Sequence, residues 1–346
     1  MNARIASVAT AVPEHVVTQS DARAFARHVF GAHVPDIERL LPAFDNTGIE
    51  RRYLVRPLEW FETPRPFVEK NAVYRETALE LSRSAATKAL DASGLDPADV
   101  GAILFVSTTG LATPSLDSFL IRHLGLSRTV VRLPIWGLGC AGGAAGLARA
   151  AELTTVLGKP TLLVAAEVCS TTFVETDRRK SNLIATALFG DGAAAVVLRP
   201  GSEGAEVLSG HSHLVDDSED VMGWQVEADG LRVVFSRSIP RLVSDLAGRI
   251  AADAAEGAGL SREALANFVF HPGGAKVLAA YAETLALDAE HLRHATSVLR
   301  DYGNMSSPSV LFVLERFLAG EPQAGRPALL MALGPGFSAE SVVFRW

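Results

Sequence analysis

The sequence has 346 residues, of which 48% are hydrophobic and 21% charged, the composition of a folded protein rather than of a disordered or fibrous one. Its 32 basic and 39 acidic residues give a formal net charge of −7, which excludes the broad positive field of nucleic-acid-binding proteins. Two cysteines are too few for a disulfide framework, so we expect a cytoplasmic protein with reduced thiols. No apolar run is long enough to predict a membrane-spanning helix.

An internal repeat organises the chain, with matching segments 165 positions apart. An Ala-rich stretch over 77–93, in which apolar residues recur every three or four positions, predicts a helix that leads into an apolar strand over 102–106. The same succession of helix, turn and strand recurs over 242–270. The polar and aromatic segment over 24–71 has no counterpart in the second half, so we expect it to be an insertion.

The repeat continues along the chain, because residues 158–163 are echoed by 325–330. Apolar strands that alternate with helices of about ten residues or more are typical of mostly parallel sheets covered by helices. We therefore predict an α/β fold of two pseudo-symmetric βαβ-type halves, residues 1–205 and 206–346, with the joint in a polar stretch over 200–220. Ligands in such proteins tend to bind where the halves meet.

Cys140 lies in a Gly-rich turn, residues 136–146, between an apolar strand and a predicted helix over 144–156. A helix N-terminus stabilises negative charge and lowers the pKa of a thiol from its usual value of about 8.5. Cys140 is therefore a candidate nucleophile. The alternative is that it is a small buried hydrophobic side chain.

The same turn matches the G-x-G-x-x-G spacing of dinucleotide-binding loops at Gly137, Gly139 and Gly142. The motif lies far into the chain, however, and places a cysteine where a pyrophosphate would bind. The second half also repeats the predicted topology without these glycines. A nucleotide-binding oxidoreductase therefore remains the weaker alternative, and it predicts measurable affinity for NAD(H).

His271 follows an apolar strand directly and is succeeded by a Pro-Gly-Gly turn, which places the imidazole at the carboxyl end of a strand. A histidine buried for packing is the alternative. Asn304 precedes a predicted helix over 310–318, and the repeat offset places it one residue from the equivalent of Cys140. Taken alone, Asn304 would be a helix cap or turn residue.

Together, Cys140, His271 and Asn304 predict one site between the two halves. A papain-like protease also uses Cys, His and Asn, but its cysteine lies near the mature N-terminus and its fold is not duplicated. A non-catalytic acyl-binding protein is the remaining alternative, and it predicts that Cys140→Ala leaves function intact.

At these residues the sequence resembles the type III polyketide synthases, the chalcone-synthase-like branch of the thiolase-fold condensing enzymes. The resemblance spans nearly the whole chain and rests on motifs at 139–143, 188–194, 271–274, 302–307 and 334–336. It implies a thiolase-like fold with a five-layered αβαβα core. The N-terminal half would hold the nucleophilic cysteine and the C-terminal half the histidine and asparagine. Other segments are most similar to bacterial members that make alkylpyrones or alkylresorcinols.

The resemblance also implies a reaction. Cys140, activated as a thiolate by His271 and the helix N-terminus, would accept a starter acyl group from coenzyme A. His271 and Asn304 would donate hydrogen bonds to the thioester oxygen of malonyl-CoA while CO₂ leaves, and the enolate would attack the Cys140 thioester. Because CoA thioesters are substrates, no cofactor and no metal is expected. A ketoacyl-ACP synthase III-like single condensation is the alternative within the superfamily.

The resemblance assigns further residues to the cavity. Phe189 and Val233 correspond to the two gatekeepers between the CoA tunnel and the cavity, and valine would widen that passage. Side chains expected to line the cavity are Cys169, Thr172 and Ser306. Val233 and Cys169 lead us to predict a medium- or long-chain fatty-acyl starter that yields a pyrone or resorcinol-type polyketide.

The expected CoA-binding cations are only partly present. Arg39 aligns with one basic position of the family, whereas Pro42 and Asn46 replace two others. Arg51 and Arg52 lie close by in the sequence and are expected to supply local positive charge. A solvated surface cluster is the alternative.

Thr113 corresponds to the residue that reaches into the neighbouring subunit's cavity in this family, which implies a homodimer. The expected small-molecule partners are an acyl-CoA starter and malonyl-CoA. Neither nucleic acid nor a membrane span is expected.

Overall fold

The computed structural model describes residues 2–31, 33–34, 36–320 and 325–346. The strands are β1 (Ala3–Ala11), β2 (His15–Thr18), β3 (Arg51–Leu54), β4 (Ala102–Val106), β5 (Val131–Ile135), β6 (Thr161–Val168), β7 (Asp191–Pro200), β8 (Ala205–Leu214), β9 (Met222–Glu227), β10 (Gly230–Phe235), β11 (Asn267–Phe270), β12 (Pro327–Gly334) and β13 (Ser338–Arg345). The α-helices are α1 (Gln19–Gly31), α2 (Ile37–Leu40), α3 (Pro42–Asp45), α4 (Phe67–Ser93), α5 (Asp117–His123), α6 (Gly142–Leu157), α7 (Lys180–Leu188), α8 (Ile239–Gly257), α9 (Ala275–Leu285), α10 (Arg293–Tyr302) and α11 (Ser309–Ala319).

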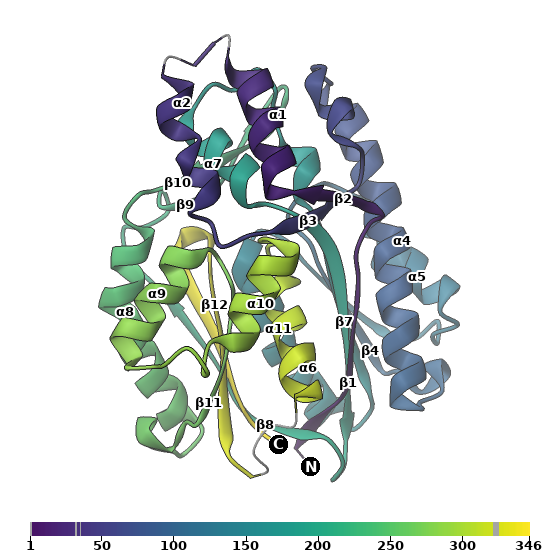
Figure 1. The fold of residues 1–346 in the computed structure, drawn as a ribbon. Coiled ribbons are helices and arrows are strands. Elements are labelled where there is room, and N and C mark those ends of the chain that lie inside the picture. Colours follow the sequence, from purple (N-terminus) through teal and green to yellow (C-terminus); the bar gives the residue numbers. More distant parts are fainter. Residues whose placement is uncertain (1, 32, 35, 321–324) are drawn as a thin grey trace.

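Nine strands form one mixed sheet in the order β11-β12-β13-β8-β1-β7-β6-β4-β5 (Figure 1). Read outward from the β1–β8 pair, the order gives two matching series, β1-β7-β6-β4 and β8-β13-β12-β11. Each series contains a parallel pair, β4 with β6 and β11 with β12. This mirrored order confirms the predicted repeat of two βαβ-type halves.

The sheet is divided at its centre, because β1 and β8 pair only at Arg4 with Glu206 and at Ile5 with Ala205. Helices α6 and α11 each contact strands of both half-sheets and therefore form the central layer. Helix α4 packs on β1, β6 and β7, while α8 packs on β8, β12 and β13. The result is the predicted five-layered αβαβα arrangement, with one helical layer inside and two outside (Figure 1).

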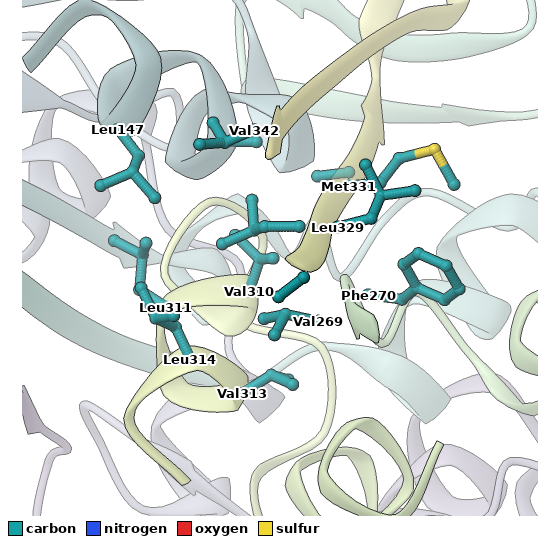
Figure 2. Packing of buried hydrophobic residues seen from close by; sticks show 14 of the residues in the cluster. Leu147, Val269, Phe270, Val310, Leu311, Val313, Leu314, Leu329, Met331 and Val342 are labelled. Carbon is teal, nitrogen blue, oxygen red and sulfur yellow. The ribbon is translucent and has the colours of Figure 1, made fainter. Parts of the chain in front are cut away.

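The central layer is held by apolar side chains from both half-sheets. Figure 2 shows Leu147 of α6 and Leu311 of α11 near side chains of β11, β12 and β13, and each of these two leucines is fully buried. Burying one such side chain contributes roughly 1.5–3 kcal/mol. The interior near the helix starts is therefore dry and closely packed, which matters for any polar group placed there.

Helix α4 begins at Phe67, ten residues before the predicted start at 77. The added turns bury Val73 and Tyr74, which continue the apolar face toward the sheet. The helix ends at Gly94, whose φ of 67° lies in the left-handed region that glycine favours. Within the described ranges, no helix is long and apolar enough to cross a membrane.

The predicted insertion over 24–71 forms most of a cap at the end of the molecule opposite the termini (Figure 1). It contributes α2, α3 and β3, and together with α1 and α7 it encloses a separate core around Phe30 and Phe44. The hairpin of β9 and β10 lies in the same region.

The polar stretch over 200–220, predicted to be the joint, includes the short turn between β7 and β8, and most of it forms strand β8 near the middle of the sheet. Only Ala205 and Val207 of this strand are buried, and its later residues are partly or fully exposed. The composition of this strand therefore resembles that of a loop, which is why the sequence did not reveal it.

Candidate active site

Three segments from the two halves meet at the start of α6. Cys140 lies in a short 3-10 helix, Gly139–Ala141, immediately before α6, and its Sγ is 3.9 Å from Asn304 Oδ1. Asn304 lies between α10 and α11, and its Nδ2 donates to the carbonyl of Gly273 at 3.4 Å. Gly273 belongs to the turn that follows His271 at the end of β11. The structure thus brings the three predicted residues into one buried region.

The glycines of the Cys140 turn are explained by packing. A Cβ on Gly139 would lie 2.7 Å from Cδ of Pro335, and one on Gly142 would lie 2.6 Å from Cγ1 of Val106. Both glycines are buried, and Gly139 has a φ of 45°. Neighbouring segments therefore close the loop around Gly139 and Gly142, although Gly137 is in open space, and this closure argues against a dinucleotide site.

Burial favours the uncharged forms of the sulfur and the imidazole. It raises the pKa of Cys140 to about 11, although side-chain hydrogen bonding with Ser306 and Asn304 lowers it. Burial also lowers the pKa of His271 to about 3. Desolvation therefore favours the thiol and the neutral ring, and it opposes the helix N-terminus, which favours the expected thiolate.

His271 is 4% exposed, yet neither of its ring nitrogens has a hydrogen-bond partner within the described residues. An unpaired buried polar group costs roughly 1–3 kcal/mol, and such groups are kept where a ligand completes them. Asn304 is better held, because its Oδ1 accepts from the backbone N–H of Ser306 at 2.8 Å. Its Nδ2 makes only the long contact to Gly273, so that donor is available to a ligand.

Glu167, at the end of β6, is a polar residue of the site that sequence reasoning did not select. Its carboxylate is fully buried and accepts hydrogen bonds from the N–H groups of Thr108 and Thr109 at 2.8 and 3.0 Å and from Ser307 at 2.7 Å. Burial raises its pKa to about 7, and its charge raises the pKa of Cys140. The sequence signal that could have identified Glu167 is an acidic residue near the end of an apolar strand. In the described part of the chain, no group of three His, Cys, Asp or Glu residues is placed to hold a metal ion.

The predicted gatekeepers lie together. Phe189 and Val233 belong to one buried cluster with Cys169. The hairpin adds two aromatic rings that the sequence did not suggest: the ring centroids of Trp224 and Phe235 lie 6.0 and 5.6 Å from that of Phe189. They were missed because short half-exposed strands give no clear periodicity.

The polar residues expected in the cavity wall have different surroundings. Thr172 is buried, and its hydroxyl donates to the carbonyl of Cys169 at 2.7 Å, so it is already occupied. Ser306 is buried beside Cys140. Its φ of 60° lies in the left-handed region, which is unfavourable for residues other than glycine. Ser306 thus lies next to the sulfur of Cys140, whereas Thr172 lines an apolar cavity that is described below.

The expected CoA-binding cations divide into exposed and buried residues. Arg39 and Arg51 are exposed, and each makes an ion pair of 3.6 Å, with Asp36 and Asp301 respectively. Arg52 is 1% exposed. Its Nη1 donates to the carbonyls of Thr186 and Phe189 at 2.7 and 3.3 Å, and its Nη2 donates to Gln19. Its guanidinium is thus engaged by buried carbonyls, while the residue also lines the cavity described below, and a role of Arg52 in binding CoA stays a prediction.

An apolar cavity adjoins the gatekeepers. Its void encloses about 560 Å³, including the part open to solvent. It is lined by Phe189, Val233 and Cys169 at one side and by side chains of the cap at the other, among them Phe25, Leu54, Leu58 and Phe61. We refer to it as the first cavity.

Comparisons with known proteins agree along the whole chain. The family model described as chalcone and stilbene synthases, N-terminal domain, matches residues 1–202, and that of the C-terminal domain matches residues 206–346. A putative chalcone synthase of Bacillus subtilis (strain 168) is 41% identical over 99% of this chain and 98% of that protein. A 1,3,6,8-tetrahydroxynaphthalene synthase of Streptomyces peucetius subsp. caesius is 38% identical over 99% of this chain and 93% of its own length. The crystal structure of 1,3,6,8-tetrahydroxynaphthalene synthase from Streptomyces coelicolor A3(2), a bacterial type III polyketide synthase, superposes with a TM-score of 0.95 at 31% identity and covers 99% of both chains.

Proposed function

The chain belongs to the chalcone and stilbene synthase family of type III polyketide synthases, condensing enzymes that use malonyl-CoA, and we propose that its starter is a medium- or long-chain fatty-acyl-CoA. The extended chain is then cyclised to a pyrone or a resorcinol. The observation that supports this starter most directly is the apolar first cavity beside Phe189 and Val233.

Acyl loading uses Cys140 and His271. The thiol proton passes to a ring nitrogen of His271, and the sulfur attacks the starter thioester. Neither ring nitrogen has a hydrogen-bond partner in the part of the chain that the structure describes. The C–S bond to coenzyme A breaks, and the leaving thiolate takes the proton back from the ring. A reduced Cys140 is required, which is the reason we place the enzyme in the cytoplasm.

Decarboxylation uses the same ring with Asn304. The N–H of neutral His271 and the Nδ2 of Asn304 donate to the thioester oxygen of malonyl-CoA, where negative charge develops as CO₂ leaves. Removing one such donor typically costs a factor of about 10²–10³ in rate. The enolate carbon forms a bond to the acyl carbon on Cys140, the C–S bond breaks, and the sulfur is released for another cycle.

The first cavity is suited to an acyl chain because most of its lining side chains are apolar. Each methylene buried there contributes about 0.8 kcal/mol, so affinity should rise with chain length until the cavity is filled. The hydroxyl of Thr172 is occupied by a backbone carbonyl and offers little to a polar starter.

A homodimer is supported by the free edge of the nine-stranded sheet. Strand β5 has no partner on one side within the described residues, and Val131 and Leu133 on it are 42% and 37% exposed. Leu111 and Trp136 in the adjoining loops are 45% and 52% exposed, and Thr113 is exposed in the same loop as Leu111. An exposed apolar edge strand is a template for pairing with another chain.

The experiment that tests this function is mass spectrometry of products formed from malonyl-CoA and a panel of acyl-CoA starters. Octanoyl-CoA to palmitoyl-CoA should be extended more than once and give cyclic products, whereas short aromatic CoA esters should be poor starters. Turnover of malonyl-CoA alone to an aromatic product, with no use of long acyl chains, would contradict the proposed starter. A linear product that requires acyl carrier protein would instead indicate a single condensation.

A further inference from the structure

A second cavity adjoins the first, and the two share a wall. Its void encloses about 640 Å³, including the part open to solvent, and its apolar side is lined by Trp60, Pro64 and Val174. Phe61 and Phe173 line both cavities and pack edge to face, with ring centroids 6.3 Å apart. These two aromatic rings therefore form part of the wall between the cavities.

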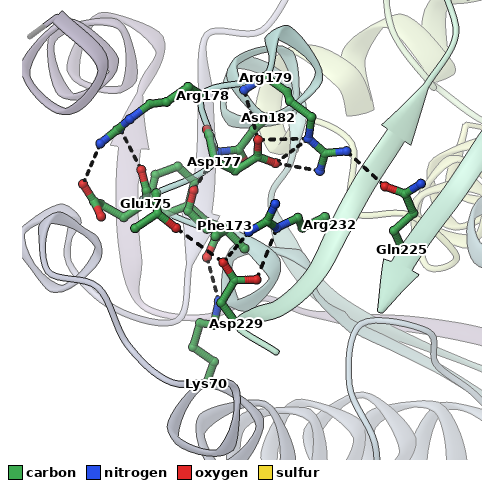
Figure 3. Close-up of polar contacts among 12 residues, drawn as sticks. Lys70, Phe173, Glu175, Asp177, Arg178, Arg179, Asn182, Gln225, Asp229 and Arg232 are labelled. Carbon is green, nitrogen blue, oxygen red and sulfur yellow. Dashed lines mark hydrogen bonds and ion pairs between the residues drawn. The ribbon is translucent and has the colours of Figure 1, made fainter. Parts of the chain in front are cut away.

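The second cavity contains an ammonium group that lacks a carboxylate partner. Lys70 of α4 is 4% exposed, and its Nζ donates to the carbonyl of Phe173 at 3.1 Å (Figure 3). Among the described residues, no carboxylate lies within 4.0 Å of this nitrogen. An ammonium has three donors, so two remain for a ligand. Burial lowers the pKa of Lys70 to about 8, although the charge of Asp229, which is beyond ion-pair distance, raises it.

The carboxylates that line this cavity are already paired. Asp229 accepts from Arg232 at 2.6 Å, and Glu175 lies 3.3 Å from Arg178 (Figure 3). The remaining cation of the wall, Arg65, pairs with Glu69 and lies 4.4 Å above the ring of Trp60. Lys70 is thus the one cation of this cavity that the described residues leave without an ion pair.

We propose that the second cavity receives the far end of the acyl starter and that Lys70 binds a carboxylate there. This inference rests on the proposed acyl-starter function and extends it to a substrate class, the ω-carboxyacyl-CoA thioesters. The chain passes between the rings of Phe61 and Phe173, which rotate apart to admit it. A hydrogen bond between two ionised groups is stronger than one between neutral groups, and partial burial strengthens it further.

The test compares starters of equal length that differ only at the far end. For the wild-type enzyme, kcat/KM is measured for dodecanoyl-CoA and for the mono-CoA thioester of dodecanedioic acid, and for the matching pairs of eight to sixteen carbons. At the chain lengths that reach Lys70, the carboxylate-terminated starter should be favoured about tenfold, since one charge-assisted hydrogen bond is worth roughly this factor. A preference for the methyl-terminated starter at every length would overturn the proposal.

Two variants of α4 separate recognition from packing. Lys70→Met should bring the ratio of the two kcat/KM values to about one. Lys88→Met is the matched control, because Lys88 also lies on α4 and donates to a backbone carbonyl, that of Thr10, at 3.1 Å. It should keep the wild-type ratio. An unchanged ratio in Lys70→Met would refute the role of Lys70, and the wild-type comparison decides the question if that variant does not fold.

A binding measurement distinguishes failure of this inference from failure of the proposed starter. Trp60 lines the second cavity, so its fluorescence should change when octanoate binds to the full-length protein and should not change with octanol. Trp60→Phe identifies the signal, and Lys70→Met should abolish the octanoate effect. If no long starter is turned over but octanoate binds through Lys70, the starter is wrong and the carboxylate site stands. If long starters are used and octanoate gives no Lys70-dependent signal, the carboxylate site is wrong.

Discussion

Phe189 and Asn304 are joined through their backbones. Gly190 N–H donates to the carbonyl of Asn304 at 3.0 Å, and Asn304 N–H donates to the carbonyl of Leu188 at 2.9 Å, so that Phe189 and Asn304 form an isolated parallel bridge. The ring that lines the first cavity and the amide that faces Cys140 are therefore positioned by one short element. A change in the cap that moves α7 should displace both.

The first prediction concerns the amide of Asn304. Asn304→Ala should lower the rate of CO₂ release from malonyl-CoA by about 10²–10³, because one donor to the developing oxyanion is lost. Intact-protein mass spectrometry should still detect the acyl group on Cys140, since loading does not need this donor. Equal losses in loading and in CO₂ release would instead assign Asn304 to the folding of the site.

The second prediction separates two neighbouring arginines. Arg52→Met should lower the free energy of unfolding by about 2–4 kcal/mol, because two buried carbonyls lose a charged donor. Arg51→Met should change it by less than about 0.5 kcal/mol, because that side chain is half exposed and its ion pair with Asp301 is long. Urea unfolding measures both. If Arg52→Met instead folds with unchanged stability and has a higher KM for CoA thioesters, Arg52 contacts CoA.

The third prediction concerns the state of the nucleophile. Because burial raises the pKa of Cys140 to about 11, alkylation by iodoacetamide at pH 7 should be far slower than that of an exposed cysteine and should accelerate toward pH 10. The background is Cys169→Ala, which removes the other thiol. Rapid alkylation below pH 7 that disappears in His271→Ala would show instead a thiolate–imidazolium pair.

Much of the fold and the placement of the site were predictable from sequence, for reasons visible in particular residues. Strand β4 is buried throughout and β11 is buried at Val269 and Phe270, and their sequence pattern already reveals the repeat that brings Cys140 and Asn304 together. The burial of Arg52 and the burial of His271 without a partner among the described residues were not predictable. Both depend on how segments far apart in the chain close around a polar group, and local sequence patterns do not encode that closure.

The fourth prediction follows from Glu167. Burial raises the pKa of its carboxyl from 4.5 to about 7, so the folded protein binds this proton more tightly than the unfolded chain does. The contribution of Glu167 to stability should therefore be greatest at low pH and decline as pH rises from about 4.5 to about 7. Burial also raises the pKa of Asp191, to about 6, so its contribution to stability should likewise decline as the pH rises.

Glu167→Gln isolates the first of these two groups. Glutamine keeps an acceptor toward Thr108 and Thr109 and can donate toward Ser307, so the variant should fold while the loss of stability between pH 5 and pH 7 becomes smaller. Thermal unfolding at a series of pH values measures this. A pH dependence identical to that of the wild type would show that Glu167 does not titrate in this range.

The last prediction concerns the edge of the sheet. Leu133→Lys places a charge on strand β5, where the proposed dimer buries an apolar row, and it should convert the dimer to a monomer in light scattering coupled to gel filtration. Val156→Lys is the matched control, because Val156 is 80% exposed at the end of α6, on a different element. The control variant should remain dimeric. A wild-type protein that is monomeric at micromolar concentration, or a Leu133→Lys variant that stays dimeric, would show that the free edge of β5 is not the subunit interface.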